Sequence, residues 1–145
     1  MKEPRLKNVM TAFPHAIDLK AALGEARAVM LELKVRHLPV TEGHELKGLI
    51  SDRDIKLVLG PELGSPDPKE LTVEDAYTDN PLLVDLEHPL REVLHAMAER
   101  HLGAAVVTAH GRLAGIFTVS DACRAFAEHL DAQFHSGETD SPDVA

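Results

Sequence analysis

Two short stretches of the 145-residue chain decide its fold: residues 48–54 read Gly-Leu-Ile-Ser-Asp-Arg-Asp, and residues 115–121 read Gly-Ile-Phe-Thr-Val-Ser-Asp. They lie 67 positions apart, and sliding the chain by that amount aligns residues 10–54 with residues 77–121 without a gap. Thirteen aligned positions are identical, far more than chance would place there. The chain is therefore predicted to contain two copies of one structural unit.

The hydrophobic pattern changes in the same order within each copy. An extended piece comes first, then a helix whose apolar residues recur at spacings of three, four and seven, then two short strands around a turn, and a second helix. The expected strands are 16–19, 38–41 and 46–50 in the first copy and 82–84, 105–108 and 113–117 in the second. Such a unit buries too little surface alone. We therefore predict an α+β (α/β) fold in which two pseudo-symmetric β-α-β-β-α repeats pack through their sheets.

The domain boundaries follow from composition. The first repeat is expected at residues 8–60 and the second at 72–132, joined by a linker at 61–71 that carries Gly-Ser-Pro-Asp-Pro. Residues 133–145 are polar and rich in Ser, Gly and Asp, so we expect a disordered tail.

Composition excludes several classes of function. The net charge is −9, and only five residues are aromatic, so the chain lacks the cations and stacking platforms of nucleic-acid binders. An anionic membrane surface is disfavoured for the same reason, and no apolar run is long enough to span a membrane. The single cysteine, Cys123, is expected to be a small buried hydrophobe. It suits a reducing compartment, and we expect a cytoplasmic protein.

At this point the sequence resembles a tandem pair of cystathionine-beta-synthase (CBS) domains, also called a Bateman module. The resemblance rests on the Met-Thr-x-x-Pro opening at residues 10–14, on Arg-His-Leu-Pro-Val at residues 36–40, and on the two endings quoted above. It implies a regulatory module that binds AMP, ADP, ATP, S-adenosylmethionine or NAD(H) in clefts between the repeats, commonly as a homodimer. No catalysis and no required cofactor are implied. Because little of this sequence lies outside the repeats, we expect the regulatory effect to be delivered to a separate protein.

The repeated ending has a physical logic for such a ligand. A glycine at 48 or 115 lets the backbone approach a flat ring, and a hydroxyl at a helix N-terminus favours phosphate. Three residues later an ionised Asp can accept bonds from both ribose hydroxyls. By resemblance, the ligand-binding residues are Thr11, Ile17, Arg36, His37, Leu38, Pro39, Ser51, Arg53, Asp54, Thr78, Val84, Gly103, Ala104, Ala105, Thr118, Ser120 and Asp121.

Charge bears on which ligand is preferred. The cations expected near the sites are few: Arg36, His37, Arg53 and Lys56 for the first, and Arg100, His101 and Arg124 for the second. We therefore expect a mononucleotide, AMP, to be preferred over a triphosphate. His37 lies beside the expected cleft, where its protonation can tune phosphate binding.

Two alternatives remain open. Ser51 with Asp54, and Thr118 with Asp121, fit helix caps that need no ligand, and the whole chain then is a structural or dimerisation module. The nine histidines suggest a metal site, but none has a complete ligand spacing, so no metal is expected. An enzyme is disfavoured, because no nucleophile lies beside an evident base and no phosphate loop is present.

Overall fold

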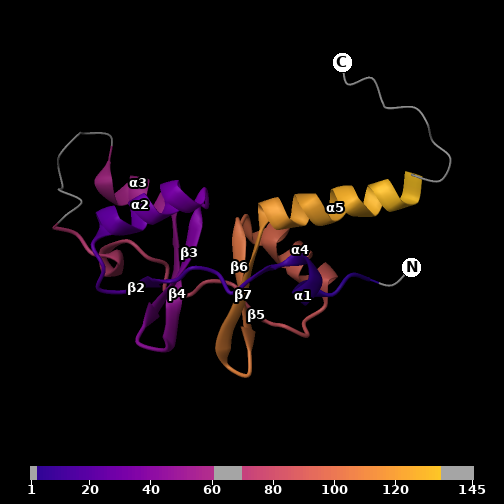
Figure 1. Cartoon of the computed structure of the whole chain (residues 1–145), viewed down its shortest axis with the longest axis horizontal. Coiled ribbons are helices and arrows are strands. Elements are labelled where there is room, and N and C mark those ends of the chain that lie inside the picture. The colour runs from indigo at the N-terminus through magenta and orange to yellow at the C-terminus, as the bar shows by residue number, and fades with distance from the viewer. Residues whose placement is uncertain (1–2, 61–69, 135–145) are drawn as a thin grey trace, which may run out of the picture.

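The computed structural model describes residues 3–60 and 70–134 (Figure 1). Most of the expected linker and the expected tail from residue 135 onward lie outside the described residues. The last helix extends to Phe134, and so includes the first two residues assigned to that tail.

Both repeats have the β-α-β-β-α order predicted from the hydrophobic pattern. The first consists of β2 (Ile17–Asp18), α2 (Leu23–Leu33), β3 (His37–Glu42), β4 (Glu45–Ser51) and α3 (Asp52–Leu59). The second consists of β5 (Leu83–Asp85), α4 (Leu90–Arg100), β6 (Ala104–Ala109), β7 (Arg112–Thr118) and α5 (Val119–Phe134). The α+β fold class and the internal repeat are thereby confirmed.

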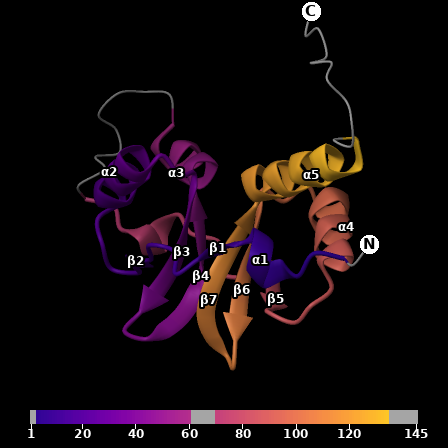
Figure 2. The ribbon, with the colours of Figure 1, turned by 45° about the vertical axis from the view of Figure 1, so that its right-hand side comes forward.

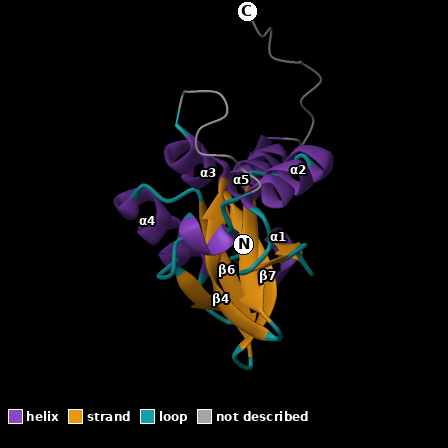
Figure 3. Cartoon of the chain, turned by 90° about the vertical axis from the view of Figure 1, so that its left-hand side faces the viewer, coloured by secondary structure: helices purple, strands orange, loops and turns teal. Residues whose placement is uncertain are grey.

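Each repeat contributes one sheet, and the two sheets pack on each other. The first sheet has the order β2-β3-β4, and the second has the order β1-β7-β6-β5. In both, the opening strand runs parallel to its neighbour and the following hairpin is antiparallel. Leu49, Ala104, Val106 and Ile116 form an apolar cluster between the sheets, which lie side by side in Figure 2. Helices α2, α3 and α5 lie at the same end of the strands (Figure 3).

The segment that leads into each repeat packs on the other repeat. Helix α1 (Leu6–Val9) and strand β1 (Thr11–Ala12) precede the first repeat, but β1 pairs with β7 and Leu6 is only 1% exposed in the core of the second. In return, the 3₁₀ helix η1 (Val73–Asp75) places Val73 in the core of the first repeat. The two repeats therefore complete each other's cores, an exchange that the sequence analysis did not predict.

These crossings explain the two glycines of the repeated ending. A Cβ on Gly48 would overlap the backbone carbonyl oxygen of Thr78, and a Cβ on Gly115 would lie 2.6 Å from Met10 Sδ and 2.9 Å from the Thr11 carbonyl oxygen. The sequence analysis assigned both glycines to the approach of a flat ligand. The structure instead gives this space to the crossing segments.

Of the remaining predictions about buried residues, two are confirmed and one is wrong. Met30 and Met97 are buried at matching places in the two repeats, as their spacing predicts. The expectation that Cys123 is buried is wrong, because α5 turns this position toward solvent. None of the helices in residues 3–60 and 70–134 is long and apolar enough to cross a membrane.

Candidate ligand-binding site

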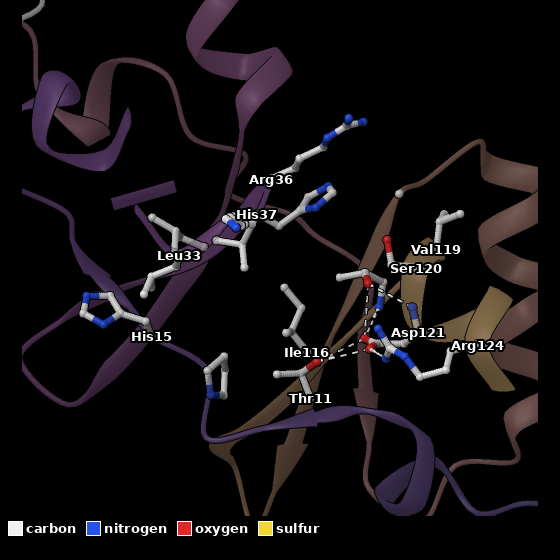
Figure 4. Close-up of a pocket in the computed structure, with 16 residues that line it drawn as sticks. Thr11, His15, Leu33, Arg36, His37, Ile116, Val119, Ser120, Asp121 and Arg124 are labelled. Atoms are coloured by element: carbon white, nitrogen blue, oxygen red, sulfur yellow. Dashed lines mark hydrogen bonds and ion pairs between the residues drawn. The ribbon is translucent and has the colours of Figure 1, made fainter. Parts of the chain in front are cut away.

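A pocket of about 480 Å³ lies between the repeats, where the start of β3 faces the start of α5 (Figure 4). Its volume is within the usual range for small-molecule sites. The lining comes from three parts of the chain. These are the crossing strand and the residues after it (Thr11, Pro14, His15), the turn from α2 into β3 (Leu33, Lys34, Val35, Arg36, His37, Leu38), and the second repeat (Gly103, Ile116, Thr118, Val119, Ser120, Asp121, Arg124).

The carboxylate of Asp121 gathers these parts together. It is 4% exposed and accepts hydrogen bonds from the Thr118 backbone N–H at 2.9 Å and from the Thr11 hydroxyl at 3.2 Å. The Asp121 N–H donates in return to the Thr118 hydroxyl at 3.3 Å, which makes the capping box that the sequence predicts. Arg124, one turn further along α5, donates to Asp121 Oδ1 at 3.1 Å. One buried carboxylate therefore holds the crossing strand against the start of α5.

The pocket is cationic although the chain as a whole is acidic. Lys34, Arg36 and Arg124 line it, and Asp121 is the only acidic residue among its lining. With the histidines neutral, these four side chains sum to a charge of about +2. Lys34 reaches the pocket because α2 ends there in a left-handed turn, with a φ of 58° at Lys34 itself. The lining thus carries more positive than negative charge.

His37 fills part of the space between the repeats. Burial lowers the pKa of its imidazole below the ordinary value, and Arg36 acts in the same direction, while Asp54 and Asp52 oppose the shift. A Cβ on Gly103 would lie 3.1 Å from His37 Nε2, so the absence of a side chain at Gly103 makes room for the ring. A neutral imidazole therefore packs against the wall of the pocket.

Of the residues predicted to bind a ligand, eight line this pocket: Thr11, Arg36, His37, Leu38, Gly103, Thr118, Ser120 and Asp121. Ile17, Pro39, Val84, Ala104 and Ala105 are buried. The other four do not line this pocket: Ser51, Arg53, Asp54 and Thr78. They are the equivalents, 67 positions away, of Thr118, Ser120, Asp121 and Thr11. The sequence analysis grouped each wall with the carboxylate of its own repeat, whereas the structure places residues 36–38 of the first repeat beside Asp121 of the second.

Ser51 and Asp54 form the matching cap at the start of α3. The Asp54 N–H donates to the Ser51 hydroxyl at 3.0 Å, and the Ser51 N–H donates to the Asp54 carboxylate at 2.9 Å. Neither hydroxyl nor backbone of Thr78 is hydrogen-bonded to Asp54, whereas Thr11 is bonded to Asp121. In the described part of the chain, no group of three or more His, Cys, Asp or Glu side chains is placed to hold a metal ion.

The sequence analysis missed some of the lining, including Lys34 and Val119, and noted Arg124 only as a nearby cation. A helix that ends at a lysine without a following glycine gives no signal that the lysine lines a pocket.

Comparison with known proteins adds to this geometry. Residues 6–60 and residues 73–128 each match the CBS domain family. The chain belongs to the CBS-domain family.

Relatives of this CBS pair include both free-standing and larger proteins. An uncharacterized Bacillus subtilis protein, YlbB, is 33% identical over 119 residues, which cover 81% of this chain and 78% of that protein. L-aspartate semialdehyde sulfurtransferase of Methanocaldococcus jannaschii is 26% identical over 87% of this chain, but the match spans only 24% of that enzyme. Most of that enzyme therefore lies outside the region that matches this chain.

Solved structures share this fold over most of the chain. CBSX2 in complex with AMP is 26% identical, with a TM-score of 0.74 over 87% of this chain and 98% of that chain. An uncharacterized conserved protein from Pyrococcus horikoshii is 27% identical, with a TM-score of 0.74 over 87% of this chain and 95% of its own. The CBS pair is therefore similar over most of its length to proteins that consist of little else.

Proposed function

We propose that this CBS pair is a regulatory module that binds an adenosine nucleotide, with AMP favoured, in the pocket around Asp121 and signals to a separate protein. The observation that carries the proposal is a buried carboxylate in a pocket between the two repeats whose lining also includes Lys34, Arg36 and Arg124. The similarity to CBSX2, whose structure contains AMP, supports the same ligand class. No chemistry on the ligand is proposed.

Each part of the nucleotide has a complementary part of the lining. The Asp121 carboxylate accepts bonds from the ribose hydroxyls, and Val35, Leu38 and Ile116 offer apolar contact to the base. Ser120, in the first turn of α5, offers its hydroxyl to the phosphate, aided by the helix dipole.

The charge of the pocket bears on the number of phosphates. A phosphate monoester carries about −1.5 to −2 at pH 7, which matches the charge of about +2 from Lys34, Arg36, Arg124 and Asp121. A triphosphate without magnesium brings a larger negative charge than these side chains balance. AMP is therefore favoured over ATP.

A ligand in this pocket touches both repeats, so it stabilises one arrangement of them relative to any other, and a partner protein can read that difference. Exposed apolar side chains at Leu57 on α3 and Phe126 on α5 support a homodimer as the form that signals. We place this function in the cytoplasm, with neither nucleic acid nor membrane as a partner, because the chain carries a net charge of −9 and one cysteine.

The alternative is a structural or dimerisation module without a ligand. One observation favours it: the Asp121 carboxylate already has protein partners on both of its oxygens. A cap and a crossing-strand contact explain this aspartate without a nucleotide.

A thermal-unfolding screen against AMP, ADP, ATP, S-adenosylmethionine, NAD and NADH separates the two. A ligand at 100 times its dissociation constant adds about 2.7 kcal/mol, which raises the melting temperature by about 5–11 °C in a chain of this length. The shift should disappear in Asp121→Asn and persist in Asp54→Asn, which carries the same change at the matching cap. A protein that melts cooperatively and responds to none of the six ligands is the structural module instead.

A further inference from the structure

The internal repeat gives the pocket residues equivalents 67 positions away, and the two sets differ in where their cations lie. Arg124 has Leu57 as its counterpart, a leucine that is 73% exposed on α3. Val119 has Asp52, whose carboxylate is already bonded to Lys56 at 2.9 Å. Ser120 has Arg53, so the first turn of α3 carries an acid and a cation side by side, and an apolar side chain stands where α5 has Arg124.

Arg124 is placed to contact more than Asp121. Its side chain is 65% exposed, and its contact with Asp121 Oδ1 engages one terminal nitrogen of a guanidinium that has five N–H donors. Figure 4 shows the side chain extending from α5 across the carboxylate, next to Thr11 and the start of the helix. The guanidinium can thus reach a group bound beside Asp121 without any movement of α5.

The ion pair also competes with a ligand. A ribose that donates hydrogen bonds to Asp121 takes acceptor sites that Arg124 and Thr11 occupy in the free protein. A nucleoside would weaken the ion pair between Arg124 and Asp121 without offering the guanidinium another anionic partner. For a nucleotide, the phosphate gives the guanidinium a new anionic partner through charge-assisted hydrogen bonds.

We propose that Arg124 recognises the ligand's phosphate, so that the site discriminates nucleotide from nucleoside, and that the chain binds one nucleotide, at Asp121, and none around Asp54. This inference rests on the proposed function. Leu57 cannot take the role of Arg124, and the cation in the first turn of α3, Arg53, lies next to Asp52, whose negative charge offsets it. The duplicated fold therefore carries one nucleotide site.

The test is calorimetric titration of AMP and adenosine into the full chain and into three variants. Arg124→Leu installs the residue type that the first repeat carries at position 57. Arg124→Lys keeps the charge but loses the planar fork. Arg53→Leu is the control, because it makes the same arginine-to-leucine change on an exposed position of α3, outside the lining of the pocket. Both Arg124 variants and the control change exposed side chains, and their melting temperatures confirm that they fold.

Wild type should bind one AMP per chain, and more tightly than adenosine. Arg124→Leu should weaken AMP by about ten- to a hundredfold, the range expected for a hydrogen bond to a charged group, and leave adenosine within about threefold. Arg124→Lys should recover part of the loss, and Arg53→Leu should bind AMP like wild type.

Other outcomes overturn the inference in distinguishable ways. Two AMP per chain, an equal loss of AMP and adenosine affinity in Arg124→Leu, or a loss of AMP affinity in Arg53→Leu, each rejects the assignment while the proposed function stands. If wild type binds neither AMP nor any other nucleotide in the thermal screen, the proposed function and this inference fail together.

Discussion

Replacing Gly48 with alanine should destabilise the protein strongly, although the backbone at this position suits alanine. The φ of Gly48 is not positive, and a Gly→Ala change without a clash usually stabilises by about 0.4–1 kcal/mol. Here the new Cβ would overlap the Thr78 carbonyl oxygen and lie 3.0 Å from Tyr77 Cδ2. Since a backbone carbonyl cannot rotate away like a side-chain tip, the segment that crosses from the second repeat must move.

The magnitude follows from what that movement breaks. The Leu49 N–H donates to the Thr78 carbonyl at 3.0 Å, and the Thr78 N–H donates to the Leu49 carbonyl at 2.8 Å. Each such bond contributes about 0.5–1.5 kcal/mol net, and forcing a methyl group into a filled space costs about 1–3 kcal/mol. Set against the small gain from replacing a glycine, we expect a loss of about 2–4 kcal/mol.

Urea unfolding with the slope checked for constancy measures this loss, and the melting temperature should fall by about 5–15 °C. Gly115→Ala is the matched comparison, since it makes the same change at the other crossing. It should cost less, because the atom nearest its Cβ is Met10 Sδ, the end of a flexible thioether, at 2.6 Å. A Gly48→Ala protein as stable as wild type, or less affected than Gly115→Ala, would show that the crossing segments do not depend on these glycines.

Three further predictions concern the core, a buried base and the surface. Leu6→Ala should cost about 2–5 kcal/mol in urea unfolding, because this side chain is buried in the second repeat, whereas Leu31→Ala at a 73% exposed position should change little; equal effects would contradict the exchange of leading segments. Burial lowers the pKa of His37, so the unfolded state binds the extra proton, and stability should fall as the pH drops below about 6.5; His37→Gln should flatten that part of the pH profile, and an unchanged slope would exclude His37 as its source. Lys20→Met, which breaks the ion pair with Glu74 at 2.8 Å, should leave the urea midpoint almost unchanged because both side chains are about half exposed, and a clear fall in the midpoint would mean that this pair does more than a surface contact.

The fold could be predicted largely from the sequence, because the repeat and the apolar spacing record which side chains must be buried. What they do not record is the sheet that buries them. The leading strand β1 is only two residues long, and the apolar side chain of Leu6 would fit either repeat on pattern alone. The repeat on which this leading segment packs depends on the space that Gly115 leaves for Met10 and Thr11 beside β7. The spacing of apolar residues in the sequence does not reveal that space.

The candidate site was predictable in its residue types and less so in its grouping. Residues 36–38 and the Thr118–Asp121 cap were recognisable as motifs, each tied to local backbone geometry. Their meeting across the two repeats depends on how the sheets pack, which is a tertiary property. Lys34 and Arg124 carry no local signal, since a cation near the end or on the exposed face of a helix is ordinary in sequence.

The contacts of Asp121 suggest how binding in the pocket can change the structure outside it. The carboxylate that would hold a ribose is the same group that receives the hydroxyl of Thr11, on the strand that crosses from the N-terminal segment. Ribose and Thr11 would therefore compete for acceptor positions on one side chain, so a bound nucleotide would loosen one end of the crossing strand. A hydrogen bond to a charged group contributes about 1.5–3 kcal/mol, which is the size of typical coupling free energies between sites. Because β1 is an edge strand of the second sheet while its chain continues into the first repeat, a change at this single contact alters the tie between the repeats, and that is a difference a partner protein can recognise.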